Sequence, residues 1–429
     1  MARIDTLSNF LTDVADSIRE KTGNTEPISC EDFDTEIESI SGGGTEISDC
    51  SSFFKSGVRV SQFEDLFPLV KKPQIAFEMF MNIPYASKPN NFNTLVNTMD
   101  TSGTTSMSYM FAGAISTGGL SLSFNTSNVT DMSYMFADNN TTTASTYNLS
   151  SFNTSNVTNM TSMFSSNYGL RNLDLSSFTT SNEKTVNMAD MFHNSLYITN
   201  IKVGNIRPNT LNQTFSGAGN RSTEIVLELS NMDTSSCTSL YQTFHSAKIK
   251  TLDLSNFNTS NVTTMQGTFD GANSLTNVTI SSSFVTNNVT TMLLMFRDCY
   301  SLENFDFSNF NTAKVTSMVQ MFSNCRVITK LNLSTFTSEK VTQTANMFQN
   351  CYKLEEIDLS NFDFTTKITS FGSMFANCGT QTNDGLTKVY VKDTDAQNWI
   401  LTKSNGKPST WSTANVIVAG SSDDLRGSE

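Results

Sequence analysis

Basic clusters, long apolar runs and closely spaced cysteine pairs are all missing from this sequence. The chain has 27 Lys and Arg against 40 Asp and Glu, and the basic residues cluster nowhere. Because nucleic-acid binding needs a basic stripe, nucleic acid is a poor candidate partner. No apolar run reaches about 18 residues, so we expect no membrane insertion. Net charge is −13, and residues 1–50 carry much of it, with 12 Asp and Glu against 3 Lys and Arg.

Residues for metal or catalytic chemistry are also scarce. The seven cysteines include no Cys-x-x-Cys pair, which disfavours zinc. Glycine-rich phosphate loops, Gly-x-Ser-x-Gly and His-Glu-x-x-His are absent. The two histidines, His193 and His245, occupy the same outward turn two repeat units apart, which separates them too far for a shared metal site and predicts surface positions. We therefore expect a protein that is not an enzyme and that uses no cofactor or metal.

An internal repeat fills most of the chain. A phenylalanine that usually follows Met or Thr returns about every 26 residues, after a degenerate unit that ends at Phe80. The eleven repeat phenylalanines are Phe111, Phe136, Phe164, Phe192, Phe215, Phe244, Phe269, Phe296, Phe322, Phe348 and Phe375. A strict period of this length predicts a solenoid in which stacked units bury a shared core.

Each unit combines a short strand with a predicted short helix. Alternating runs such as residues 173–175 predict strands of about three residues. A Ser-x-Phe step and an Asn-Thr-Ser-Asn-Val-Thr stretch follow, and then Met160, Met163 and Phe164 recur at helical spacing. The expected fold class is an α/β repeat: a leucine-rich-repeat solenoid of short parallel strands with short helical or 3-10 returns.

Four cysteines occupy one repeat position, three residues after the repeat phenylalanine. Other units place Ala, Asn or Ser there, so the position favours a small, buried side chain. We expect these cysteines to be unpaired structural thiols, as suits a protein that folds in a reducing cytosol. They are Cys299, Cys325, Cys351 and Cys378.

The middle residue of each strand points out of the core and forms a candidate receptor face. Five of its eleven members are acidic: Asp174, Glu228, Asp253, Asp306 and Asp358. A solvated polar face is one interpretation and contact with a receptor is another. Glu228 and Asp253, expected on adjacent rungs, leave open a third, because paired carboxylates can perform general acid–base chemistry or bind calcium.

The pattern Leu354-x-x-Ile357-x-Leu359-Ser-Asn-Phe362, followed by Met-x-x-Met-Phe, resembles the BspA-like leucine-rich repeats of bacterial surface proteins, including the mycoplasma and lactobacillus surface-protein repeat. The resemblance covers roughly residues 51–395. It departs from the general leucine-rich pattern by placing Phe where Asn or Cys usually turns the chain. The resemblance implies a right-handed solenoid and adhesion, and it implies no catalytic residues.

The N-terminal segment has a different pattern, typical of helices. One apolar seam has a/d spacing, and a capping box at Ser29–Asp32 predicts a second helix before three glycines at 42–44. The seam, which either packs on that second helix or trimerises, comprises Ile4, Leu7, Leu11, Val14 and Ile18. Residues 11–24, with Ile28-Ser and the run at 32–40, resemble the N-terminal module of tail and other virion proteins of phages of Gram-positive bacteria. That resemblance implies docking onto a particle.

These patterns predict four regions: a helical virion-docking or oligomerisation module at 1–44, a cap with a degenerate repeat at 45–106, BspA-like repeats at 107–379, and a C-terminal cap and tail at 380–429. Trp399 and Trp411 should help cover the open end. No secretory signal is visible, so we expect cytosolic synthesis.

The hypothesis is a non-enzymatic phage virion protein, on the particle surface, that attaches to a host protein or glycan. It would bind other virion proteins through its N-terminal module and form a homo-oligomer. The alternatives are a bacterial cell-surface adhesin and, less favoured, a tail-spike glycan hydrolase.

Overall fold

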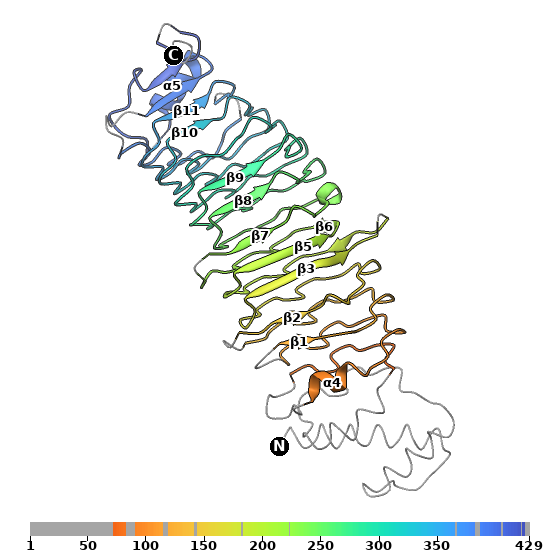
Figure 1. Cartoon of the computed structure of the whole chain (residues 1–429). Helices are drawn as coiled ribbons and strands as arrows, with labels where there is room; N and C mark the ends of the chain where they lie inside the picture. Colours follow the sequence, from red (N-terminus) through yellow and green to blue (C-terminus); the bar gives the residue numbers. More distant parts are fainter. Residues whose placement is uncertain are drawn as a thin grey trace, which may run out of the picture.

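The computed structural model describes residues 72–424, except 83–90, 115–118, 141–143, 182, 223, 365–366, 382–386, 405 and 422. Over this range the chain forms a parallel β-solenoid of about eleven turns, here called coils. Figure 1 shows the coils stacked side by side along one long axis. The predicted module at 1–44, with the seam Ile4, Leu7, Leu11, Val14 and Ile18, lies outside the described residues.

The strands pair in parallel between successive coils and form several small sheets. Their orders are β1-β2, β3-β5-β7, β4-β6, β8-β9 and β10-β11-β12-β13. The strands are β1 Leu120–Ser121, β2 Tyr147–Asn148, β3 Asn172–Thr179, β4 Val186–Asn187, β5 Asn200–Asn205, β6 Pro208–Thr210, β7 Val226–Glu228, β8 Thr251–Leu254, β9 Asn277–Ile280, β10 Lys330–Asn332, β11 Glu356–Leu359, β12 Lys388–Val391 and β13 Val416–Val418. Within the described residues the helices are α4 Phe92–Val96, the 3-10 helix η3 Thr234–Ser236 and α5 Thr394–Thr402.

The expected helical returns are not found in the described coils, which is why the fold is a β-solenoid and not an α/β repeat. Each return has two residues in the left-handed region, such as Leu294 (φ 62°) and Asp298 (φ 59°), and a right-handed helix cannot continue through them. Its alternate N–H groups donate to the next coil: Phe296 N to Met321 O (2.8 Å) and Asp298 N to Ser323 O (2.8 Å). We call these returns the turn ladder.

Stacked phenylalanine rings form the core beside the turn ladder. The rings run from Phe80 to Phe375, with neighbouring centroids 5.1 to 5.8 Å apart and planes within 14° of parallel. All are fully buried. The predicted repeat period therefore places one ring in each coil, and the degenerate unit at Phe80 belongs to the same stack.

A buried hydroxyl column, which the sequence analysis missed, joins the coils on another side. Thr286 Oγ1 donates to the carbonyl of Asn311 in the next coil (2.8 Å) and accepts from the N–H of the same residue (2.7 Å). This two-way bridge satisfies a backbone donor and acceptor where no sheet is present. The same bridge is made by Thr126, Thr154, Thr234, Thr259, Thr312 and Ser338.

The C-terminal elements close the end of the core. Strands β12 and β13 extend the last sheet, and α5 packs beside them. Asp393 caps α5 by accepting the N–H of Ala396 (2.9 Å). Trp399 contacts Phe371 edge to face with ring centroids 4.8 Å apart, and Trp411 is also buried. These tryptophans thus cover the apolar end, as the sequence predicted.

Candidate functional site

The predicted receptor face is a column of side chains in register across the strands. Asp174 on β3 pairs with Lys202 on β5, which pairs with Glu228 on β7. Asp253 lies on β8 and Asp358 on β11, while Asp306 lies in a coil without a strand. All five predicted acidic residues are exposed except Asp358, which is half-buried. The structure therefore places these residues at the outward position of their coils, with register shown within each sheet, whereas Tyr390, which pairs with Asp358, is buried. Receptor contact stays a prediction.

Most carboxylates of this column also accept a backbone hydrogen bond from the residue two positions later. Asp253 Oδ1 accepts the backbone N–H of Ser255 (2.9 Å), and Asp174 does the same with Ser176 (2.8 Å). These hydrogen bonds, first from the Ser side chain and then from the backbone, lower the pKa of both carboxyls. This Asx turn explains why both Asp and Asn occur at the middle strand position, because either side chain can accept the backbone hydrogen bond.

The carboxylate pair suggested for hydrolysis is not aligned by a common sheet. Glu228 ends β7, whereas Asp253 belongs to β8 in a separate two-stranded sheet. The lowered pKa of Asp253 is the reverse of what a general acid requires. This geometry offers no support for the glycan hydrolase.

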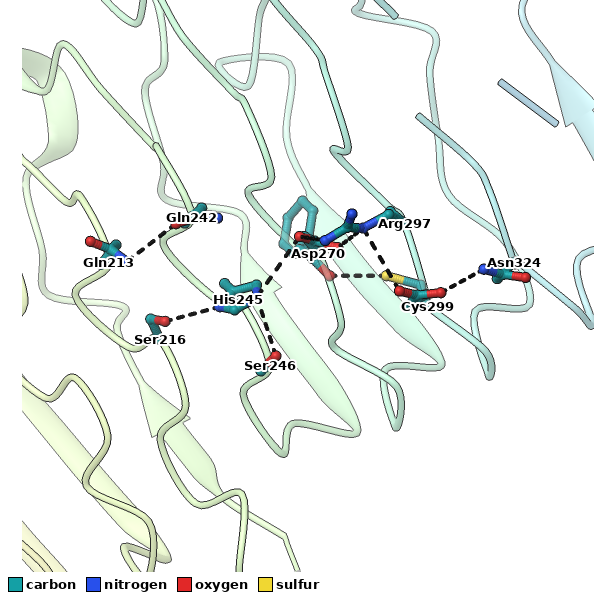
Figure 2. Close-up of polar contacts among 11 residues, drawn as sticks. Gln213, Ser216, Gln242, His245, Ser246, Asp270, Arg297, Cys299 and Asn324 are labelled. Carbon is teal, nitrogen blue, oxygen red and sulfur yellow. Dashed lines mark hydrogen bonds and ion pairs between the residues drawn. The ribbon is translucent and has the colours of Figure 1, made fainter. Parts of the chain in front are cut away.

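A line of charged side chains occupies the turn ladder (Figure 2). His245, Asp270 and Arg297 each directly follow a repeat phenylalanine on three successive coils. Arg297 holds Asp270 with two hydrogen bonds of 2.7 Å, and His245 Nε2 lies 3.8 Å from Asp270 Oδ2. His245 Nδ1 lies 3.2 Å from Ser216 Oγ, and Nε2 lies 3.4 Å from Ser246 Oγ.

Burial governs the electrostatics of this line. The Asp270 side chain is only 1% exposed, and burial raises its pKa, while the hydrogen bonds from Arg297 oppose that rise. Burial also lowers the pKa of His245, with Asp270 acting in the opposite direction. Arg297 in turn has a raised pKa, chiefly from its hydrogen bond to Asp270.

The order Ser216, His245 and Asp270 is that of a nucleophilic triad, but the environment suits a structural role. Ser216 is buried at 2% exposure, so its hydroxyl is shielded from a substrate. Both oxygens of Asp270 are engaged by Arg297. The line therefore ties three coils together.

Sequence reasoning missed this line because it considered the histidines alone. His193 and His245 do lie in one column, two coils apart, with side chains 29% and 33% exposed. They are thus half-buried, not fully on the surface as expected. Reading the whole column after the repeat phenylalanines would have revealed His, Asp and Arg in consecutive units.

The laddered cysteines lie in the core as predicted. Cys299, Cys325, Cys351 and Cys378 are free and at most 1% exposed. Three of their thiols donate to the carbonyl of a repeat phenylalanine in the preceding coil, for example Cys325 Sγ to Phe296 O (3.2 Å). Burial raises the pKa of each thiol, to about 12 for Cys378. Such thiols are poor nucleophiles.

Among the described residues, no group of three or more His, Cys, Asp or Glu side chains could hold a metal ion. In the same part of the chain, no helix is long and apolar enough to cross a membrane.

These features define a repeat protein of the parallel β-solenoid class, built around stacked phenylalanines. The chain matches the family described as "Mycoplasma protein of unknown function, DUF285" over residues 78–203, 209–330 and 276–389. The matches cover more than half of the chain, which therefore belongs to this family. No curated protein matches it. The family and the solenoid both fit the BspA-like repeat; the phage module, at residues outside the family match, stays a prediction.

Proposed function

We propose that this chain is a non-enzymatic attachment protein whose solenoid presents its exposed strand column to a protein or glycan on a host cell. One observation carries the proposal. A buried phenylalanine column recurs in the described coils, whereas the outward column beside it changes among Asp, Lys, Glu and Thr. Variation on a rigid repeat frame is how solenoids build extended binding surfaces.

We further propose that the solenoid is carried on a phage virion. The support is the resemblance of the N-terminal segment, whose seam would dock on other virion proteins or join copies of the chain. The seam variant Leu11→Asp/Val14→Asp should then lose incorporation into particles while keeping the melting profile of the solenoid. Asp13→Asn/Asp16→Asn, at polar positions of the sequence outside the apolar seam, is the matched control, which should still be incorporated.

A bacterial cell-surface adhesin is the second candidate, favoured by the match to a family of mycoplasma proteins. Antibody labelling of purified particles and of the producing cells separates the two. Label on particles supports the virion role, and label confined to the cell envelope contradicts it in favour of the adhesin.

The attachment role itself is tested by adding purified, fluorescently labelled chain to host cells. Saturable binding that excess unlabelled chain displaces supports it. Absence of saturable binding, or measurable turnover of wall polysaccharide, contradicts the proposal of a non-enzymatic attachment protein.

A further inference from the structure

The strand face is interrupted between β9 and β10. The intervening coil, residues 303–307, is not a strand, and Figure 1 shows no arrow there. Its one backbone hydrogen bond to a neighbouring coil joins Glu303 N to Thr276 O (3.2 Å). Between β8 and β9, by contrast, four consecutive residues pair in register. The sheet thus opens at this coil.

The bulk of Phe305 explains the opening. The inward strand position holds Leu252, Val278, Leu331 and Ile357 in the other coils nearby, and these side chains are at most 4% exposed. Phe305 is only partly buried, and its ring lies 4.8 Å from those of Phe296 and Phe307. Two rings at alternate positions of this short segment exceed the space that smaller side chains fill, which accounts for the missing strand pairing.

A groove of about 780 Å³ lies at this opening. That volume falls within the range of pockets that hold small ligands, roughly 300–1,000 Å³. Most of its lining residues have polar side chains, and they come from four successive coils; they include Ser301, Glu303, Asn304, Thr329, Lys330 and Lys353. Hydroxyl, amide, carboxylate and ammonium groups therefore face one space.

The groove is locally basic on an acidic chain. Its lining carries Lys330 and Lys353 against Glu303, while the chain as a whole has a net charge of −13. Lys330 also lies 3.6 Å from Glu356, but its side chain is 69% exposed. An exposed pair of this kind is weak and readily exchanged for a ligand.

A glycan fits this lining better than a peptide or a nucleic acid. A peptide would need apolar pockets, and Val327 is the single apolar residue of the lining. Glu303 would repel a uniformly anionic polymer. Sugar hydroxyls can donate to the Glu303 carboxylate and accept from Asn304, while an acidic substituent pairs with the lysines. Beside the groove, the Arg326 guanidinium lies over the Tyr300 ring at 4.2 Å and holds an aromatic side chain at the edge.

We propose that this groove binds an acidic glycan, a short sugar chain that bears carboxylate or phosphate groups. The site rests on the proposed attachment function and specifies its ligand class. Phe305 opens the groove, the lysines bind the acidic group, and Glu303 and Asn304 bind the hydroxyls.

Calorimetric titration of the full chain tests the site with a maltooligosaccharide that bears one carboxylate, a maltooligosaccharide that bears one phosphate, the neutral maltooligosaccharide and inorganic phosphate. Binding of either acidic oligomer supports the proposal and identifies the acidic group. Lys330→Ala/Lys353→Ala should weaken that binding about tenfold or more. Lys250→Ala, an exposed lysine at the position equivalent to Glu303 two coils earlier, is the matched control and should leave it unchanged.

Equal affinity for the neutral oligomer, or inorganic phosphate competing as well as the acidic oligomers, would overturn the proposal. Host-cell binding without glycan binding would overturn the site and leave the attachment role standing. Glycan binding without host-cell binding would support the site and contradict the attachment role.

Phe305→Leu tests the cause of the groove separately. Leucine occupies this position in β8 and β10, so the variant should fold. It should restore strand pairing at residues 303–307 and lose glycan binding. Hydrogen exchange should then show added protection at residues 304–306. A Phe305→Leu protein with that added protection and undiminished glycan binding would overturn the proposed location.

Discussion

The turn ladder and the strand face of this solenoid have the same period but different continuity. Parallel bridges follow the turn-ladder side from Ile75 to Thr210, through β4 and β6, and from Ser239 to Ser370. A hydrogen bond from Leu211 N to Ser239 O (3.1 Å) joins the two runs. The strand face is instead divided into separate sheets, with breaks after β2, β7 and β9. The turn ladder, with its phenylalanine stack, therefore keeps the coils in register, and the strand face can vary or open without loss of the fold.

The largest expected effect comes from the phenylalanine stack. Phe296→Ala should cost about 3–5 kcal/mol by leaving a cavity among packed rings. Asp306→Ala, on the exposed column of the following coil, should cost little. Denaturant unfolding of the two variants measures the difference, and equal destabilisation would contradict the assignment of the two faces. Because each coil of a solenoid contacts only its neighbours, the loss of stability should stay local. Hydrogen exchange should therefore rise mainly in the coils that adjoin Phe296.

The hydroxyl column should rank next. Thr286→Val keeps the shape of the side chain but leaves the N–H and carbonyl of Asn311 without their partner. One hydrogen bond contributes about 0.5–1.5 kcal/mol net, so the loss of both bonds of this part-buried bridge should cost about 1–3 kcal/mol. Thr279→Val, on the exposed column of β9, is the control and should be close to neutral. If both variants unfold at the same denaturant concentration, the two-way bridge contributes nothing to stability.

The period, the buried columns and the C-terminal cap could be predicted because each depends on a recurring apolar position. The return could not, since the spacing of Met160, Met163 and Phe164 suits one helical face and a chain of tight turns equally well. The left-handed residues give no signal either: they include Tyr109 and Leu294, which favour no such conformation. Hydrogen bonds between coils settle the choice, and a single unit does not contain them.

The candidate site was predictable to a similar extent. The outward column follows from strand alternation, so Asp174 and Asp253 could be placed correctly. Their Asx turns do not follow from the charge of the side chains, although a serine two residues later is the available signal in the sequence. The groove beside Phe305 depends on how one large ring fits against neighbouring coils, and strand patterning carries no information about that fit.

Acid should weaken the turn ladder through His245. Burial lowers its pKa below the ordinary value of 6.5. Below about pH 6.5 His245 therefore binds a proton more readily in the unfolded chain than in the folded chain, which favours unfolding. This contribution to stability is present above pH 6.5 and is lost as the pH falls toward the lowered pKa. Asp270 raises the pKa of His245 and so reduces this loss of stability, whereas Arg297 and His193 lower that pKa and increase the loss. His245→Gln should therefore narrow the difference in unfolding free energy between pH 7 and pH 5. Lys250→Gln controls for surface charge, and an unchanged difference in the His245 variant would rule out this coupling.

The smallest effect on stability, and the sharpest test of the strand face, should come from removing its charge while keeping its turns. In Asp174→Asn/Glu228→Gln/Asp253→Asn/Asp306→Asn, each asparagine can still accept the N–H two residues later, as Asn148 and Asn332 already do. The melting temperature should therefore change by no more than a few degrees.

If the column contacts the receptor, the charge-neutral variant should bind host cells more weakly than wild type. The alanine version of the same four sites separates the two roles, since it loses charge and turns together. Undiminished cell binding by the charge-neutral variant would move the receptor contact away from this column, and the groove at Lys330 and Lys353 would then be the next surface to test.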